Sequence, residues 1–257
     1  MIKKYAAEIK HLKFYIITIP FVIFFSYAIY FFCGDVIIEK MKDENQFFEL
    51  GTSFLFLLTS ILFLKSYLYN KNIFLLLLSI LLFFGAGEEL SWGQNLLGFK
   101  TPVELSKINV QKEFNLHNIE IFNTNNFDHT HKKGWHRLLE INFLFRIFIM
   151  FFGIVLPFSV AHNTWAKNLL YKTKIPIPPI SLGIFFLVSW IVLEILLKYL
   201  PAGKSENYYA SAVEIFEFLT SYVFFTIGIY FFRMRKINIM GLGIIDYLNH
   251  INNRYKQ

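Results

Sequence analysis

Six long apolar stretches constrain the fold of this chain more than any other feature. Each approaches or reaches the roughly 20 residues that a helix needs to cross the hydrocarbon core of a bilayer. Because a lone strand in lipid would leave its backbone polar groups unpaired, we expect each stretch to be helical. The stretches lie near residues 14–33, 47–64, 73–90, 141–161, 180–200 and 212–232.

The composition agrees with a chain whose solvent is lipid. Apolar residues make up 55% and charged residues 17% of the sequence, whereas soluble domains carry about 25% charged residues. The single cysteine, Cys33, excludes an intramolecular disulfide bond. No internal repeat divides the chain. The sequence therefore predicts one all-α integral membrane domain over residues 1–257, a polytopic transmembrane bundle of about six spans.

The positions of Lys and Arg predict the orientation of the bundle, because cytoplasmic segments of membrane proteins are enriched in these residues. If the N-terminus is inside, the cytoplasmic segments hold most of the Lys and Arg, and their acids are limited to Glu8 and Asp246. We therefore expect both termini in the cytoplasm and the chain in the plasma (inner) membrane. The net charge of +7 then reflects topology and not a nucleic-acid partner. The cytoplasmic segments are 1–13, 65–72, 162–179 and 233–257.

The long hydrophilic segment 91–140 is extracytoplasmic in this topology. Within it, the run from Thr101 to Glu104 has the pattern of a capping box, with proline at the first helical position. It predicts a short interfacial helix that begins at Pro102. Inside the fourth span, Pro157 predicts a kink, which neighbouring helices can tolerate.

Acidic residues gather at the outer face of the membrane in this topology. They lie at the starts of the second and sixth spans, at the end of the third and near the end of the fifth. Ionisable groups at this depth are costly, usually face the bundle interior and indicate a functional site. The alternative is that they are solvated helix ends that mark the interface. These residues are Glu49, Glu88, Glu89, Glu194, Glu214 and Glu217.

Helical spacing predicts which of these side chains share a face. Glu214 and Glu217 are three residues apart and lie on one face, with Ser221 one turn deeper. Glu49 and Ser53 are four residues apart and share a face in the same way. Each acidic turn is thus expected to carry a hydroxyl group next to its carboxylate.

For two further pairs of residues, the sequence predicts that one pair of side chains diverges and that the other pair meets. Glu88 and Glu89 are adjacent, so their side chains diverge by about 100° and only one is expected to face a shared centre. Trp92, four residues after Glu88, is expected to lie over it. Arg146 and Glu194 lie at matching depths in the fourth and fifth spans, which predicts a structural ion pair.

Four of the seven histidines fall in the 91–140 segment. The run Asn115–Asn118 is polar in apolar surroundings, so we expect a re-entrant or capping loop that lowers His117 onto the acidic residues. The run from Asp128 to His131 contains an H-x-H element, for which a solvated loop is the alternative interpretation. The four histidines are His117, His129, His131 and His136.

Glutamate and histidine together favour a divalent metal such as zinc, manganese or iron. A metal-bound water would act as the nucleophile, with a spare glutamate as the general base. The sequence lacks HExxH, GxSxG, P-loop and GxGxxG motifs, so acyl-serine and nucleotide chemistries have no support. The predicted metal ligands are Glu49, His117, Glu214 and Glu217.

Two motifs carry a resemblance to known proteins. Gly87–Gln94 contains EE-x-SWGQ and is followed by Gly-Phe-x-Thr-Pro, and Asn115–Asn118 reads NLHN. Together they resemble a group of uncharacterised prokaryotic multi-pass membrane proteins, a resemblance that covers most of the chain and implies no activity. A fainter similarity is to the superfamily of membrane hydrolases that includes alkaline ceramidases, seven-span proteins with Glu, Ser, Asp and His around a zinc ion. This chain departs from them in its six predicted spans and its lack of a late HxxxH pair.

These observations favour a membrane-embedded hydrolase or transferase that acts on a lipid or lipid-linked substrate at the outer leaflet. Two alternatives stay open: an ion-coupled transporter that uses the acids as a cation or proton site, and a non-catalytic subunit that binds another membrane protein. The inner halves of the spans carry few polar residues and no inverted repeat is visible, which places the transporter second. The predicted catalytic residues are Glu88, Glu89 and His117. The predicted substrate-binding residues are Trp92, Gln94 and Asn118.

Overall fold

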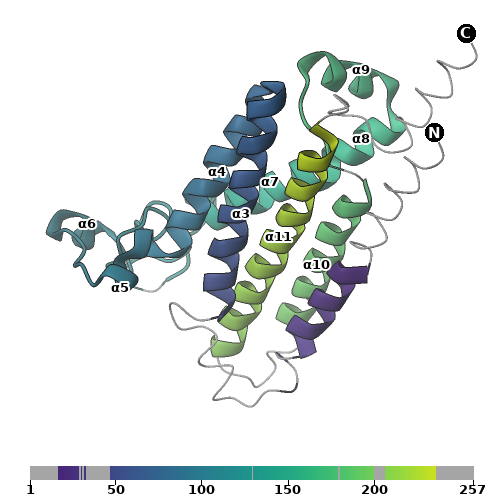
Figure 1. The fold of residues 1–257 in the computed structure, drawn as a ribbon. Coiled ribbons are helices and arrows are strands. Elements are labelled where there is room, and N and C mark those ends of the chain that lie inside the picture. Colours follow the sequence, from purple (N-terminus) through teal and green to yellow (C-terminus); the bar gives the residue numbers. More distant parts are fainter. Residues whose placement is uncertain are drawn as a thin grey trace, which may run out of the picture.

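A computed structural model describes residues 17–28, 30, 32, 47–128, 130–178, 180–199 and 206–235. In this part of the chain all regular secondary structure is helical, and the β-structure consists of isolated bridges in the 91–140 loop. Figure 1 shows long helices side by side, with this loop projecting from the bundle. The prediction of an all-α protein is confirmed for the described residues.

Three helices pack in a row, with α3 (Phe47–Asn70) between α4 (Ile73–Glu89) and α11 (Glu206–Met234). A short turn joins α3 to α4, and the two helices pack as an antiparallel hairpin. Ser60 and Ser79 link them, since each hydroxyl lies 2.7 to 2.8 Å from the other residue's carbonyl oxygen. Helix α11 packs along α3.

Small residues let α3 and α11 approach each other closely. A Cβ atom added at Gly51 of α3 would lie 2.7 Å from the Phe218 ring of α11. A Cβ atom added at Gly228 of α11 would lie 3.0 Å from the Thr59 side chain of α3. These contacts pair Gly51 with Phe218 and, further along both helices, Thr59 with Gly228. The residue numbers increase in the same direction, so α3 and α11 are parallel.

The predicted span near 141–161 consists of α7 (Ile141–Phe148), the π-helical segment η3 (Ile149–Val155) and α8 (Leu156–His162). Pro157 has no N–H group to donate. Immediately before Pro157 the backbone has π-helical geometry: the N–H of Leu156 donates to the carbonyl of Phe151, five residues earlier, where an α-helix would use the residue four earlier. The predicted disturbance at this proline therefore takes the form of a π-helical segment.

Helix α10 (Ile180–Tyr199) crosses this span at a pair of glycines. A Cβ atom added at Gly183 would collide with the carbonyl oxygen of Gly153. Gly183 therefore lets the two backbones touch, and Gly153 leaves room for the Phe186 ring of α10, from which an added Cβ would be 2.5 Å away.

Within the described residues, three helices are long and apolar enough to cross a membrane. Helix α4 makes a fourth if it is counted together with Ser91–Leu97, which bends away from it by 65°. The three long helices are Phe47–Asn70, Ile141–Val160 and Ser211–Arg233. Two shorter apolar helices are Ile17–Ala28 and Leu182–Val192. Each of the six predicted stretches thus contains helix, and the structure shows three to four candidate spans.

An aromatic core fills the middle of the bundle around Phe224 of α11, which is fully buried. The centroid of its ring lies between 5.2 and 6.4 Å from five other phenylalanine rings. These rings come from α3, α7, η3 and α10, so the core ties the spans together. The five residues are Phe56, Phe145, Phe148, Phe152 and Phe186.

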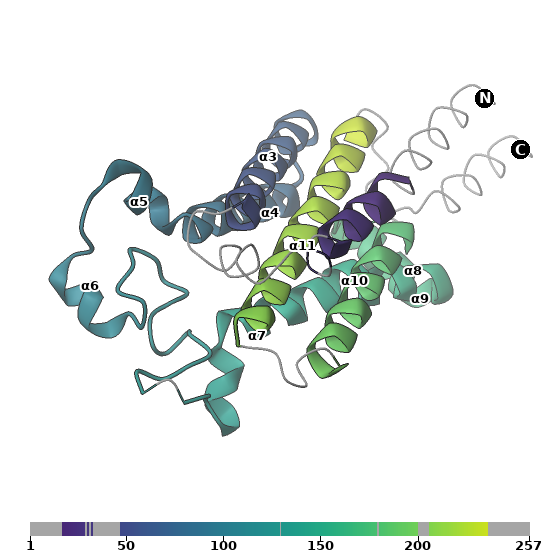
Figure 2. The same ribbon diagram turned by 90° about the horizontal axis from the view of Figure 1, so that it is seen from below.

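The 91–140 loop contains α5 (Gln94–Leu97), α6 (Val103–Ile108) and the 3-10 segment η2 (Gly134–Leu139). Figure 2 shows it on one side of the helices. Helix α6 begins one residue after the predicted start, but the predicted capping box is wrong. The Thr101 hydroxyl donates to the carbonyl of Lys112 at 2.7 Å and caps no helix.

Along the chain, helix α9 (Thr164–Thr173) follows α8 and precedes α10. The sequence predicted only a cytoplasmic connection over 162–179, so this helix is a finding of the structure. Figure 1 shows α9 near the last turns of α11, away from α5 and α6.

Candidate functional site

Four glutamates from three helices meet at the end of the bundle where α3 begins and α4 ends. Glu89 of α4 lies within electrostatic range of Glu217 and Glu214 of α11 and of Glu49 of α3. All four residues are partly buried. We call Glu49, Glu89, Glu214 and Glu217 the carboxylate cluster.

The register of the helices explains why these side chains meet. The Ser53 hydroxyl of α3 donates to the Ala86 carbonyl of α4 at 2.7 Å, so the first turn of α3 lies beside the last turn of α4. The close approach of Gly51 to Phe218 places the same turn of α3 beside the acidic turn of α11. The prediction that these acids gather at one level is confirmed for the four members of the cluster.

Two hydroxyl groups lie one helical turn beneath the carboxylate cluster. Thr52 follows Glu49 by three residues in α3, and Thr220 follows Glu217 by three residues in α11. Both threonines are 0% exposed, and within the described part of the chain neither hydroxyl has a hydrogen-bond partner. Because an unpaired buried polar group is costly, these hydroxyls favour a polar atom of a substrate or a water molecule beside them. The two serines predicted beside the acids instead donate to backbone carbonyls.

Arg146 of α7 and His117 of the loop bring positive charge to the cluster. Both lie within electrostatic range of Glu217, the histidine when it is protonated. The Arg146 guanidinium lies 5.9 Å from the ring centroid of Phe216, the residue before Glu217. The side chain of Glu194, the predicted partner of Arg146, lies outside the described residues. The predicted Arg146–Glu194 ion pair therefore stays a prediction, and in the described part of the chain Arg146 lies within electrostatic range of Glu217.

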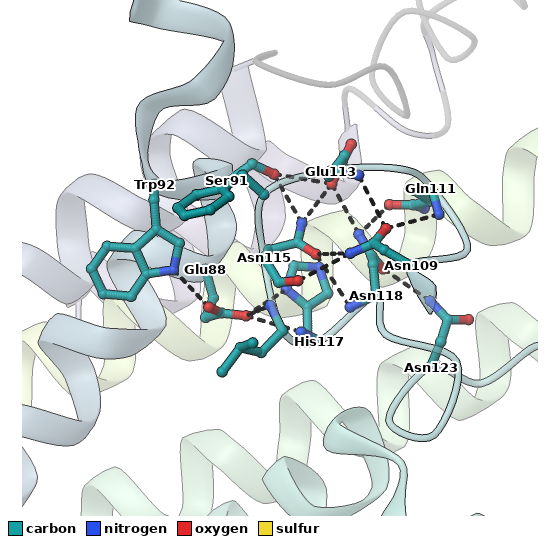
Figure 3. A network of polar contacts seen from close by, with 12 residues as sticks. Glu88, Ser91, Trp92, Asn109, Gln111, Glu113, Asn115, His117, Asn118 and Asn123 are labelled. Atoms are coloured by element: carbon teal, nitrogen blue, oxygen red, sulfur yellow. Dashed lines mark hydrogen bonds and ion pairs between the residues drawn. The ribbon is translucent and has the colours of Figure 1, made fainter. Parts of the chain in front are cut away.

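Glu88 faces the loop (Figure 3). Its Oε1 atom accepts a hydrogen bond from the Trp92 indole N–H at 2.7 Å. Its Oε2 atom accepts bonds from the backbone N–H groups of Leu116 at 2.6 Å and His117 at 2.9 Å. The Nδ1 atom of His117 lies 3.4 Å from the same oxygen. The predicted divergence from Glu89 is confirmed, and so are the predicted contacts of Trp92 and His117 with an acid.

A strained turn carries the chain from α4 into the loop. Ser91, Trp92 and Gly93 have φ angles of 46°, 54° and 80°, all in the left-handed region. Such a conformation costs about 1–2 kcal/mol for each non-glycine residue. The Glu88–Trp92 hydrogen bond helps to hold the turn, and the indole lies on Gly87, where an added Cβ would be 2.8 Å from the ring.

A second buried carboxylate, Glu113, organises the interior of the loop. Its Oε2 atom accepts bonds from the Ser91 hydroxyl at 3.0 Å and from the side-chain amides of Asn115 at 2.6 Å and Asn118 at 2.9 Å. The Asn109 side-chain oxygen accepts from the backbone N–H of Glu113 at 3.0 Å. Figure 3 shows this network beside the Glu88 contacts. This network was not predicted from the sequence, although the density of asparagines between 109 and 118 was the available signal.

The three side chains predicted to bind substrate all make contacts within the protein. Trp92 and Asn118 donate to the two buried carboxylates. The Gln94 side-chain oxygen accepts from the backbone N–H of Phe114 at 2.6 Å. These contacts build the loop, and a role in substrate binding stays a prediction.

The other loop histidines lie apart from this arrangement. His131 forms a β-bridge with Asn125, and His136 stacks on Trp135 with ring centroids 3.8 Å apart. His129 lies outside the described residues. Within the described ranges, no group of three or more His, Cys, Asp or Glu side chains is placed to hold a metal ion. The metal site stays a prediction that this geometry does not support.

A scan against protein-family models, a search of curated proteins and a search of solved structures each found no match. The resemblance to the EE-x-SWGQ group and the similarity to alkaline ceramidases therefore stay expectations.

The chemistry available at the cluster is proton transfer. Like charges 4 Å apart repel by about 4 kcal/mol at an effective dielectric constant of 20. Four carboxylates beside Arg146 and His117 therefore need protons or a cation to balance their charge. Carboxyl groups and an imidazole at one place form a set of general acids and bases.

Proposed function

We propose that this chain is a six-span membrane bundle with both termini in the cytoplasm, and that the carboxylate cluster is the active site of a membrane-embedded hydrolase or transferase. Its substrate is a lipid or lipid-linked molecule that enters from the outer leaflet, beneath the loop that carries the short interfacial helix α6. The observation that supports this most is the convergence of four partly buried glutamates from α3, α4 and α11 beside His117 and Arg146.

The distribution of charge supports an outward-facing site. The carboxylate cluster lies at one end of the bundle, beside the 91–140 loop, which carries six Lys or Arg and five Asp or Glu residues. The segments 65–72 and 162–179 at the other end are about half as long together and carry five Lys, four of which are exposed, and no Asp or Glu. Positive charge is enriched on the cytoplasmic side of membrane proteins, so this distribution supports an outer position for the cluster. The exposed lysines are Lys65, Lys71, Lys172 and Lys174.

The aromatic core supports chemistry at the cluster over transport through the bundle. Phe56 follows Thr52 by four residues in α3, and Phe224 follows Thr220 by four residues in α11. Packed apolar rings therefore lie directly beneath the buried hydroxyls. An ion-coupled transporter needs polar groups along its path near the middle of the membrane.

His117 is the general base of the proposed mechanism, and Glu88 is its positioning residue. A water molecule or an acceptor hydroxyl attacks the carbonyl or phosphoryl centre of the substrate, and its proton passes to Nε2 of His117. With Nδ1–H directed toward Glu88, the carboxylate orients the ring and stabilises the imidazolium that forms. A protonated carboxyl group of Glu89 or Glu217 gives its proton to the leaving oxygen, while Arg146 stabilises the negative charge that develops.

Lipid turnover by the purified full-length chain tests this function. The chain is reconstituted in nanodiscs of a bacterial polar-lipid extract, and products are followed by mass spectrometry. Glu89→Gln and His117→Asn should each reduce product formation roughly 100-fold or more. Glu104→Gln is the matched control, because the Glu104 side chain is 85% exposed in the loop and should leave turnover unchanged.

Equal turnover by the wild type, by Glu89→Gln and by His117→Asn would refute the assignment. Proton or cation flux into proteoliposomes that requires Glu89 would favour the transporter instead. A membrane protein that co-purifies without any lipid product would favour the non-catalytic subunit. Elemental analysis of the purified wild type and of His117→Asn tests the predicted divalent metal, such as zinc, separately from activity.

A further inference from the structure

Helix α9 has an exposed apolar face that the carboxylate site does not use. Leu170 is 7% exposed and packs with Val160 and Ile177, which fixes one face of the helix to the bundle. Trp165 and Leu169 lie one turn apart on another face and are 71% and 44% exposed. A tryptophan and a leucine at helical spacing therefore project away from the described part of the protein.

This helix begins where a membrane span ends. The span Ile141–Val160 is followed almost directly by the start of α9 at Thr164. Between them, the Asn163 side-chain oxygen accepts from the backbone N–H groups of Trp165 at 2.9 Å and Ala166 at 3.2 Å. This N-cap fixes the first turn of α9 at the edge of the span. Trp165 therefore lies at the level of the bilayer interface, where tryptophan is enriched.

The charges beside this face are positive. Lys172 and Lys174 are exposed at the end of α9. The Asn72 side chain donates to the carbonyl of Lys174 at 2.7 Å, so the α3–α4 turn with Lys71 lies beside the same end of α9. Neither segment, 65–72 or 162–179, contains an Asp or Glu residue. The region is therefore complementary to an anionic surface.

We propose that α9 is an interfacial helix that binds anionic phospholipids. Trp165 and Leu169 insert between the headgroups, and Lys172 and Lys174 contact the phosphates. Short helices that combine apolar residues with lysines are typical of membrane-surface segments, and anionic headgroups attract lysines near the bilayer. Lipid is the occupant because this face starts at headgroup level directly after a span. The inference requires that Ile141–Val160 cross the membrane, and it is independent of activity at the carboxylate cluster.

The position of Trp165 can be measured in the full-length chain. Nanodiscs of phosphatidylcholine and phosphatidylglycerol are made with and without bromine on the acyl chains. The fluorescence of the wild type minus that of Trp165→Phe isolates this residue. Brominated lipid should quench most of this difference, and aqueous iodide should quench little of it. Quenching by iodide alone would place Trp165 in water and overturn the proposal, as would a co-purifying protein that shields it from both quenchers.

The electrostatic part has its own test. The double variant Lys172→Gln/Lys174→Gln should retain about two-fold less phosphatidylglycerol than the wild type when lipids bound to the purified protein are counted by native mass spectrometry. Lys100→Gln/Lys133→Gln is the matched control, because both lysines are exposed in the 91–140 loop. Retention equal to the wild type in the first variant, or an equal fall in both variants, would show that α9 does not select anionic lipid.

Discussion

Replacing Glu88 by glutamine tests whether this side chain holds the 91–140 loop in place. The carboxylate uses both oxygens as acceptors, one for the Trp92 indole and one for the backbone N–H groups of Leu116 and His117. A glutamine amide has the same shape but offers one oxygen, so its NH2 group must face at least one of these donors. The best arrangement keeps the two backbone bonds and loses the bond to Trp92.

The size of the effect follows from these contacts. A hydrogen bond to a charged group contributes about 1.5–3 kcal/mol, and the two bonds that survive also lose their charged acceptor. We therefore expect the closed loop to lose about 3 kcal/mol relative to open states. Since 1.4 kcal/mol is tenfold in an equilibrium constant, amide hydrogen exchange at Leu116 and His117 should accelerate roughly 100-fold. Hydrogen–deuterium exchange mass spectrometry of the peptide that contains both amides measures this change.

Glu89→Gln is the matched control for this experiment. It makes the same chemical change one residue away, on a side chain that faces the carboxylate cluster and not the loop. Exchange at Leu116 and His117 should therefore stay at the wild-type rate in this variant. Wild-type exchange in Glu88→Gln, or equal acceleration in both variants, would refute the claim that Glu88 anchors the loop.

Three further predictions concern packing and charge. Gly183→Ala should lower the free energy of unfolding by about 1–3 kcal/mol, because its Cβ collides with the Gly153 carbonyl, and thermal unfolding in detergent measures the loss. Gly87→Ala should displace the Trp92 indole, whose ring would lie 2.8 Å from the new Cβ, and shift its fluorescence. Burial lowers the pKa of Lys132 from its usual 10.5, against the opposing effect of nearby acids. The unfolded chain then binds that proton more tightly, so the free energy of unfolding should rise as the pH rises through the lowered folded pKa toward 10.5. Lys132→Gln should remove this increment in unfolding measured across the same pH range.

The helices in the six predicted stretches could be predicted because each stretch is a long apolar run, and three to four of these helices are long enough to cross a membrane. Helix α4 matches its predicted stretch within one residue, but α3 continues to Asn70, beyond the predicted end at 64. Hydropathy marks where the apolar residues of a helix end. The backbone hydrogen bonds of α3 continue beyond that point, so its true end could not be predicted in this way. Helix α9 escaped prediction because its apolar residues point two ways, Leu170 toward the bundle and Trp165 and Leu169 away from it.

The candidate site was partly predictable for a related reason. Topology assigns each glutamate a depth, so the gathering of the carboxylate cluster follows from the sequence once the spans are known. The rotation of α4 decides whether Glu88 or Glu89 faces the cluster, and the contacts of Ser53 and Ser60 with α4 set that rotation. The partners of Glu113 depend on the path of the loop, which hydropathy does not constrain.

The adjacency of Glu88 and Glu89 couples the loop to the carboxylate cluster. Any rotation of α4 that moves Glu89 within the cluster also moves Glu88 against the loop, because the two side chains share one helical turn. The same Glu88 holds the backbone of His117, which lies within electrostatic range of Glu217, so the position of the proposed base depends on a residue outside the cluster. The left-handed strain in the turn after α4 persists only while these contacts hold it, as is common near functional sites. If the loop opens, the strain in this turn is released and His117 moves away from the carboxylate cluster at the same time. Loss of the Glu88 contacts with the loop therefore also removes the proposed base.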